Sequence, residues 1–113
     1  MSNLENTKAQ MRKGVLEYCI LSIIGQGEAY PSEIITNMKD AKLIIVEGTL
    51  YPLLTRLKNA GLLTYRWEES QSGPPRKYYK LTQIGTEFLK ELSGTWNELS
   101  NAVKLTTNNP HKS

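Results

Sequence analysis

Side chains that most often perform catalysis or bind metals are scarce in this sequence. The 113 residues contain one cysteine and one histidine, Cys19 and His111, so they can form neither an intramolecular disulfide nor a metal site with several cysteines. The phosphate-binding motifs G-x-x-x-x-G-K-[ST] and G-x-G-x-x-G are both missing. Glu68 and Glu69 are adjacent, and adjacent strand residues point to opposite faces, so these carboxylates cannot easily act on one substrate. The absences argue against an enzyme and predict neither a cofactor nor a bound metal.

Long apolar runs are missing as well. No stretch approaches the ~20 consecutive apolar residues that cross a bilayer, and the N-terminal residues mix acids with bases, unlike a secretory signal. We therefore expect a cytoplasmic protein without a membrane partner. Cys19 lies in the apolar stretch EYCILSII, which favours a small buried hydrophobic side chain over a reactive thiol.

Positive charge is concentrated in one segment of the chain. The net charge is only +3, but residues 56–80 contain six Lys or Arg and two Glu, a local net charge of +4 that leaves −1 for all other residues. A confined basic excess favours a polyanionic partner. The alternative is a surface on which the same cations form salt bridges within the protein.

Apolar residues at spacings of three and four predict helices in the first half of the chain. One helix is expected from about Leu4 to Gly25, and a second opens with Pro31 in its first turn and ends near Asp40. The apolar stretch at 42–46, KLIIV, is compatible with a brief strand or with a buried linker.

A third, short helix is predicted to begin abruptly near Glu47 to Thr49. Its apolar face comprises Leu50, Leu53, Leu54 and Leu57. The opposite side is polar, aromatic and cationic, with Thr49, Tyr51, Pro52, Thr55, Arg56 and Asn59. A start at Thr49 would place Pro52 in the tolerated first turn, and Gly61 provides the left-handed stop.

A two-stranded ribbon and a long last helix follow. Residues 63–68 alternate between apolar and polar, residues 76–82 form the returning strand, and SQSGPP between them supplies the turn. Thr82 caps a helix expected from Gln83 to Leu105. That helix has an apolar stripe made of Ile84, Phe88, Leu92, Trp96, Leu99 and Val103.

This order of elements predicts a winged helix-turn-helix of the α+β class, mainly helical, with double-stranded DNA as its partner. The third helix would enter the major groove, and the ribbon would meet the adjacent backbone or minor groove. Candidate base or phosphate contacts on the helix are Thr49, Tyr51, Pro52 and Arg56, and on the ribbon Arg76 and Lys77 would neutralise phosphates. The alternative is a winged-helix module that uses the exposed Tyr51 face to bind another protein.

Two motifs at this separation resemble the signature of the PadR family of bacterial transcriptional regulators. They are EGTLYPLLTRLKNAGLL at 47–63 and GPPRKYYKLTQIGTEFL at 73–89. The single C-terminal helix is similar to that of the short PadR subgroup. The resemblance implies a recognition helix at 47–59, a wing at 63–82, and a homodimeric repressor that binds an inverted-repeat operator and responds to a small aromatic or drug-like molecule. Val46 stands where the family usually has a capping Ser or Asn.

The resemblance also gives a role to the apolar stripes at the two ends of the chain. A protein of this size cannot easily cover both stripes, so we expect a homodimer. The predicted dimer interface comprises Val15, Cys19, Ile23, Phe88, Leu92, Trp96 and Leu99. Trp96 would lie near the two-fold axis, where it could stack on a flat ligand. The alternative is an interface aromatic without a ligand.

The expected domain division follows from these assignments. Residues 1–82 would form the winged helix-turn-helix domain, 83–106 the C-terminal dimerisation helix, and 107–113 a disordered tail that contains His111. The chain shows no internal repeat and no interdomain linker.

Overall fold

The computed structural model describes residues 2–108, which form four helices and one two-stranded antiparallel sheet. This confirms the predicted α+β, mainly helical winged fold. None of the helices in this range carries an apolar segment long enough to span a bilayer. The elements, in chain order, are α1 (Asn3–Gly25), α2 (Pro31–Asp40), α3 (Glu47–Asn59), β1 (Leu63–Ser70), β2 (Gly73–Leu81) and α4 (Gln83–Thr107).

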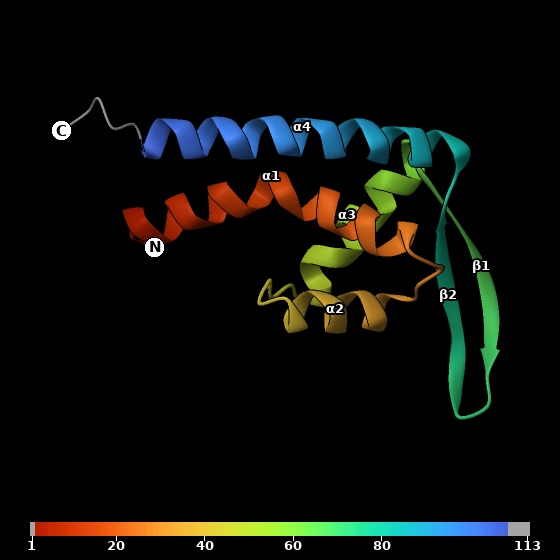
Figure 1. The fold of residues 1–113 in the computed structure, drawn as a ribbon. Helices are drawn as coiled ribbons and strands as arrows, with labels where there is room; N and C mark the ends of the chain where they lie inside the picture. Colours follow the sequence, from red (N-terminus) through yellow and green to blue (C-terminus); the bar gives the residue numbers. More distant parts are fainter. Residues whose placement is uncertain (1, 109–113) are drawn as a thin grey trace.

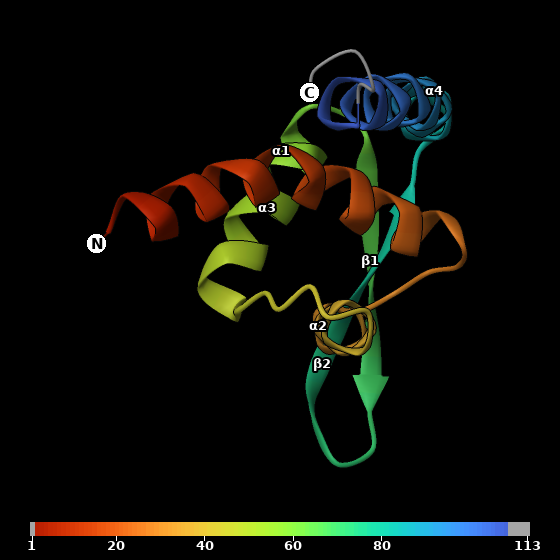
Figure 2. The ribbon, with the colours of Figure 1, turned by 60° about the vertical axis from the view of Figure 1, so that its left-hand side comes forward.

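The two long helices lie along the top of the molecule in Figure 1, and the wing runs down from the end at which α4 begins. α1 and α4 run antiparallel where they touch, since Tyr18 contacts Trp96 while Gly25 lies beneath Leu89. The view in Figure 2 shows that α1 diverges from α4 toward its N-terminus. The radius of gyration of 16.7 Å exceeds the ~13 Å expected for a compact domain of this length, so a single chain is elongated.

The hydrophobic core lies where α1, α2, α3 and the base of the wing meet. Leu50, Leu54 and Leu57 bury the apolar face of α3, as the helical spacing predicts, while Leu53 is only partly buried. No charged or polar side chain is buried among residues 2–108. Cys19 is half-buried at the edge of this core rather than enclosed in it.

α3 begins too early in the chain for Pro52 to lie in its first turn. The helix starts at Glu47, and Val46 at the N-cap position supplies no side-chain hydrogen bond. Pro52 therefore lies inside the helix, and because proline has no N–H, the carbonyl of Gly48 receives no bond from it. Both residues are exposed, so water can satisfy the free carbonyl.

Gly61 produces the abrupt corner between α3 and β1. Its φ of 81° is in the left-handed region, which glycine adopts without a Cβ clash. The N–H of Leu62 donates to the carbonyl of Leu57 at 3.0 Å, and the N–H of Gly61 donates to that of Lys58 at 2.9 Å. These two bonds form a Schellman motif, after which β1 begins at Leu63.

The wing turns more tightly than its sequence predicts. Only Gln71 and Ser72 lie between the strands, and β2 already begins at Gly73, so Pro74 and Pro75 are strand residues. The register shifts here because Glu69 alone lies opposite both prolines. A bulge in a sheet of two edge strands tolerates prolines, which cannot donate to the ladder.

The remaining segments differ from the expectations in small ways. Residues 42–46 form neither a strand nor a wholly buried linker: Ile45 is buried, whereas Ile44 and Val46 are exposed. Thr82 caps α4 as predicted, accepting a bond from the N–H of Gly85 at 2.9 Å. α4 continues to Thr107, and the rest of the predicted tail from 109 on, His111 included, lies outside the described residues.

Candidate nucleic-acid interface

The six predicted DNA contacts lie in two separate hollows on either side of α3. The first hollow, which we call the wing cleft, lies between the N-termini of α2 and α3 and the wing, has a volume of about 280 Å³, and contains Tyr51, Arg76 and Lys77. The complete set of residues that line it is Tyr30, Pro31, Ser32, Glu47, Tyr51, Trp67, Pro75, Arg76 and Lys77. The structure thus brings the helix and wing candidates together here.

The second hollow, which we call the α1–α3 hollow, has a volume of about 620 Å³ and contains Thr49, Pro52 and Arg56. α1 supplies the opposite wall. The complete lining is Ala9, Lys13, Leu16, Glu17, Gly48, Thr49, Pro52, Leu53 and Arg56. These three candidates therefore face α1 more closely than they face the wing.

Arg56 is held by an acidic residue of α1. Its guanidinium forms an ion pair with the carboxylate of Glu17, although the Arg56 side chain remains 58% exposed. The pair spans two elements, so the spacing within α3 could not reveal it. In this conformation Arg56 directs its charge toward α1, and a DNA contact by this residue requires it to leave Glu17.

The two predicted phosphate contacts of the wing, Arg76 and Lys77, point to opposite sides of the ribbon. Strand alternation and the observed register divide the wing into an inner face and an outer face. The inner face, which continues from the core, consists of Leu63, Tyr65, Trp67, Lys77, Tyr79 and Leu81, and the outer face of Thr64, Arg66, Glu68, Arg76, Tyr78 and Lys80. Lys77 therefore lies beside the indole of Trp67, whereas Arg76 lies opposite Glu68.

Aromatic rings hold the Lys77 ammonium on the inner face. Its nitrogen lies 4.5 Å from the ring centroid of Tyr65 and 5.1 Å from that of Trp67. Contacts of this kind leave the charge available to solvent and ligands while they fix its position.

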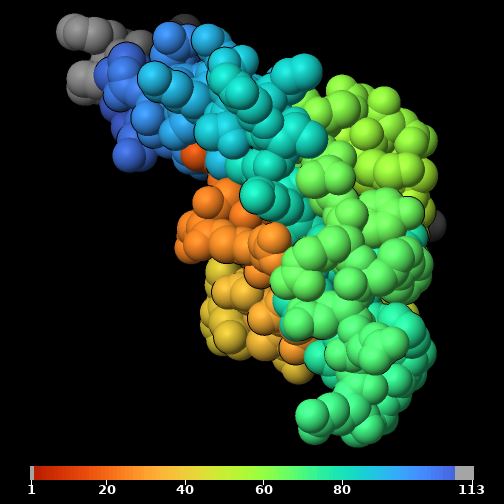
Figure 3. Space-filling view, turned by 90° about the vertical axis from the view of Figure 1, so that its right-hand side faces the viewer, coloured from red at the N-terminus to blue at the C-terminus, as the bar shows by residue number. Residues whose placement is uncertain are grey.

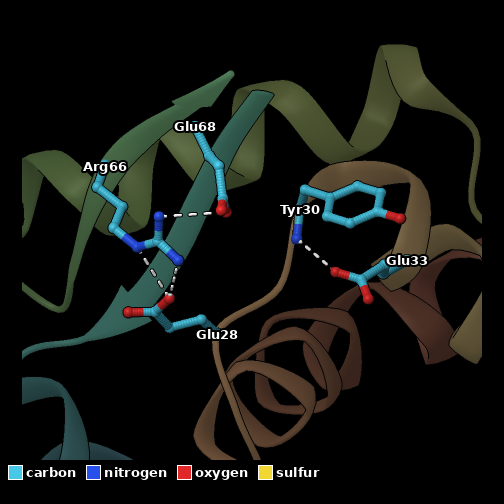
Figure 4. Close-up of polar contacts among 5 residues, drawn as sticks. All are labelled: Glu28, Tyr30, Glu33, Arg66 and Glu68. Atoms are coloured by element: carbon cyan, nitrogen blue, oxygen red, sulfur yellow. Dashed lines mark hydrogen bonds and ion pairs between the residues drawn. The ribbon is translucent and has the colours of Figure 1, made fainter. Parts of the chain in front are cut away.

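Arg66, on the outer face, is occupied by two carboxylates (Figure 4). Its Nε and Nη2 donate to Oε2 of Glu28 at 3.0 and 2.9 Å, and Nη1 lies 3.2 Å from Oε2 of Glu68. The hydrogen bond to Glu28, in the loop before α2, raises the pKa of the Arg66 guanidinium above its ordinary value. Arg66 thus joins the wing to the helical body rather than presenting a free charge.

Tyr30 makes a second connection between α2 and the wing. Its ring meets that of Tyr78 edge-on at 5.0 Å, and the Arg76 guanidinium carbon lies 4.6 Å from its centroid. The Tyr30 N–H donates to the Glu33 carboxylate at 3.0 Å (Figure 4). Next to it, Ala29 and Tyr79 exchange backbone bonds of 3.1 and 2.8 Å. The arm that protrudes in Figure 3 is therefore fixed at its base.

Sequence reasoning missed Tyr30, Ser32 and Trp67 as residues of the wing cleft. Alternation along β1 placed Trp67 on the same side as Tyr65, but nothing in the local pattern shows that α2 reaches the wing. Tyr30 precedes α2 in the chain and lies far from β2 in sequence. Its partner Tyr78 could be found only from the tertiary structure.

The residues predicted for a dimer interface form a partly exposed surface on α1 and α4. Val15, Cys19 and Ile23 are half-buried, and burial raises the pKa of the Cys19 thiol, which favours its neutral form. On α4, Leu92 packs against the core. The large apolar residues of α4 that the single chain leaves exposed are Ile84, Phe88, Trp96, Leu99, Val103 and Leu105.

Trp96 is partly exposed, and its ring lies near that of Tyr18 of α1. The ring centroid of Tyr18 lies 6.4 Å from that of Trp96, with the planes tilted by 37°, and the Trp96 side chain is 41% exposed. Among residues 2–108 no group of three or more His, Cys, Asp or Glu side chains is arranged to bind a metal ion.

Comparison with known proteins places this geometry among transcription factors. Residues 20–91 match the model of the Transcriptional regulator PadR-like family. A PadR-like transcription factor from Bacteroides fragilis is 61% identical, with a TM-score of 0.75 over 88% of this chain and 96% of that one. A PadR family regulator from Eggerthella lenta is 31% identical, with a TM-score of 0.83 over 94% and 93% of the two chains.

One similar structure contains DNA. Bacillus subtilis PadR in complex with operator DNA is 27% identical, with a TM-score of 0.64 over 69% of this chain and 46% of that chain. The likeness covers the greater part of this chain, whereas B. subtilis PadR is considerably longer.

Proposed function

Because this chain belongs to the PadR-like family of transcriptional regulators, we propose that it is a homodimeric repressor that binds an inverted-repeat operator in double-stranded DNA. Family members are transcriptional regulators and not enzymes. The observation that carries the proposal is the wing cleft, in which Tyr51 of α3 lies together with Arg76 and Lys77 of the wing. A polar-faced helix beside a cationic ribbon suits a major groove and its flanking phosphates.

α3 and the wing have dimensions that suit this role. The 13 residues of α3 span about 20 Å, which suits a helix lying in the ~12 Å wide major groove. Tyr51 and Thr49 would contact base edges, with Pro52 packed beside them. Arg56 would join them after it releases Glu17.

The wing residues would position the protein without reading sequence. Arg76 on the outer face and Lys77 on the inner face can contact phosphates on both walls of the groove that the ribbon enters. Because phosphate contacts are independent of sequence, loss of either cation should weaken binding to all duplexes alike.

A homodimer would cover the exposed stripe of α4 and set the distance between two recognition helices. The elongated single chain leaves Phe88, Trp96 and Leu99 exposed on one surface, next to the half-buried Val15, Cys19 and Ile23 of α1. Pairing through residues 83–106 would leave the two domains at 1–82 free to occupy successive major grooves, about 34 Å apart.

A small aromatic effector would bind at Trp96. The exposed ring face of Trp96, backed by Tyr18 at 6.4 Å, can stack on a flat apolar molecule near the two-fold axis. Titration of the protein with planar drug-like compounds should quench or shift Trp96 emission, with a Trp96→Phe variant as the control for Trp67. If emission from Trp96 is unchanged at high ligand concentration, Trp96 is an interface aromatic only.

Electrophoretic shift on the DNA upstream of the protein's own gene tests the main proposal. We expect a discrete complex at low salt that weakens steeply as salt rises, since phosphate contacts release counterions. Addition of effector candidates should release the DNA. A winged-helix module that binds another protein would show no shift with any promoter fragment, and this outcome would refute the proposal.

A further inference from the structure

Trp67 is a large apolar side chain that the fold leaves exposed. It lies on the inner face of the wing, beyond the core, and the residue is 60% exposed. The ring of Tyr65 meets it edge-on, with centroids 6.1 Å apart and planes at 89°. Tyr65 is itself packed against the core, so the indole is held in place on one side and open on the other.

The turn end of the wing extends this apolar surface. Trp67, Glu69, Pro74 and Pro75 line a shallow hollow there. The two prolines have fixed φ angles and no N–H groups, and the bulge opposite Glu69 sets their direction. Trp67 and the prolines therefore form a stiff apolar edge, with little side-chain entropy left to lose on contact.

Cations flank this edge and indicate which partner it fits. Lys77 lies 5.1 Å from the Trp67 ring, and Arg76 follows Pro75 in the wing cleft. An apolar plate with a cation beside it complements a groove that has apolar sugar walls and phosphate rims. The same cleft contains Tyr51 of α3, so the surface is continuous with the proposed recognition helix.

We infer that Trp67, supported by Pro74 and Pro75, is a DNA contact that enters the minor groove next to the major groove occupied by α3. The inference rests on the proposed function. Trp67 is the fifth residue of β1, about 13 Å along the strand from Leu63, and it lies in the same cleft as Tyr51 of α3. An indole entering edge-on fits a groove ~6 Å wide, where apolar side chains of other proteins act as wedges.

This contact would add a preference that phosphate contacts cannot supply. G·C pairs place the guanine 2-amino group in the minor groove, whereas A·T pairs leave its floor open. Trp67 should therefore favour A·T pairs beside the base pairs that α3 reads. Its share of the affinity should not depend on salt, because apolar contact displaces no counterions.

Fluorescence anisotropy with a labelled duplex, repeated over a series of salt concentrations, tests the inference. Trp67→Ala should weaken binding about tenfold, the factor for burial of roughly half an indole, with the salt slope unchanged. Trp67→Phe should keep most of the affinity. Lys77→Gln, the matched charge variant on the same face, should lower the slope by about one.

A second duplex separates the minor groove from other contacts. Inosine in place of guanine removes the 2-amino group and leaves the major-groove edge unchanged. The wild-type protein should bind the inosine duplex more tightly than the guanine duplex, and Trp67→Ala should bind both alike. Circular dichroism of each variant checks that the fold is retained.

The outcomes distinguish failure of this inference from failure of the proposed function. If the wild-type protein binds no duplex at low salt, the proposed function is wrong and the inference fails with it. If the wild type binds and Trp67→Ala keeps both its affinity and its response to inosine, the inference alone is overturned.

Discussion

Fewer cations are available in the basic segment at 56–80 than its composition suggests, because two of its arginines form ion pairs with carboxylates. Arg56 is paired with Glu17, and Arg66 with Glu28 and Glu68. The alternative of a salt-bridged surface is therefore correct for these two arginines. The other cations of the segment are Lys58, Arg76, Lys77 and Lys80, of which the first three lie over aromatic rings.

Glu17 should restrain Arg56 in the absence of DNA. Removal of its charge by Glu17→Gln should raise affinity for duplex DNA by up to about fivefold, because an exposed pair contributes up to ~1 kcal/mol. Anisotropy titration measures the change. Glu5→Gln is the control, since it removes the same charge from the first turn of α1, outside the α1–α3 hollow. Equal effects of both variants would show that only net charge matters.

Where α4 meets the chain between α3 and β1, the backbones pack so closely that one position leaves no room for a side chain. The first turn of α4 packs directly on the chain between α3 and β1, so a Cβ at Gly85 would overlap the carbonyl oxygen of Leu62. Thr82 reinforces the contact because its hydroxyl donates to the carbonyl of Gly61 at 2.6 Å. The position of the wing relative to α4 therefore depends on one glycine.

Gly85→Ala should lower the free energy of unfolding by about 1–3 kcal/mol, since the overlap is with backbone that cannot rotate away. Gly14→Ala is the matched control, because a Cβ at this position of α1 would meet no atom within 4 Å. That substitution should raise stability by about 0.5–1 kcal/mol. Urea unfolding at equal protein concentration measures both. Equal destabilisation by the two would contradict the packing of α4 on Leu62.

The outer face of the wing offers a second matched pair, Arg66 and Arg76. Arg66→Gln should weaken DNA binding without changing the salt slope, because Arg66 fixes the wing through Glu28. Arg76→Gln should lower the slope by about one, as expected for a lost phosphate contact. Anisotropy titrations at several salt concentrations give both slopes. A lowered slope for Arg66→Gln would mean that this residue leaves Glu28 for a phosphate.

The whole molecule is elongated, and an exposed apolar stripe runs along α4. The proposal of a homodimer follows from this stripe, since a second chain is the simplest cover for a stripe of this length. The operator contacts would then depend on a surface remote from α3 and the wing.

Leu99→Asp should convert the protein to a monomer, because Leu99 lies in the stripe with 53% of its side chain exposed and a buried carboxylate without a partner is costly. Sedimentation velocity measures the mass. Asn101→Asp introduces the same charge at an exposed position of α4 outside the stripe and should leave the mass unchanged. A monomeric wild-type protein would refute the dimer outright, whatever the variants do.

Periodicity and turn residues were sufficient to predict the elements and their order. The corner at Gly61, the cap at Thr82 and the alternation of β1 followed from the sequence, since each depends on residues within one turn or strand. Periodicity left the start of α3 open between Glu47 and Thr49, and the helix begins at Glu47. The wing turn was misplaced because a bulge admits Pro74 and Pro75 into β2. Strand pairing, which local sequence does not report, sets that register.

The sequence did not show which cations form ion pairs within the protein and which remain available to a polyanion. Arg66 and Glu28 are 38 residues apart, and Arg56 meets Glu17 across two helices, so no local spacing reveals either pair. Residue type gave the charges and periodicity gave the faces on which they lie. Two packing contacts, that of α1 on α3 and that of the loop before α2 on the wing, determine which cations are neutralised and which remain available to a polyanion. Ion pairing depends on distances between side chains, and these distances arise only when the elements pack together.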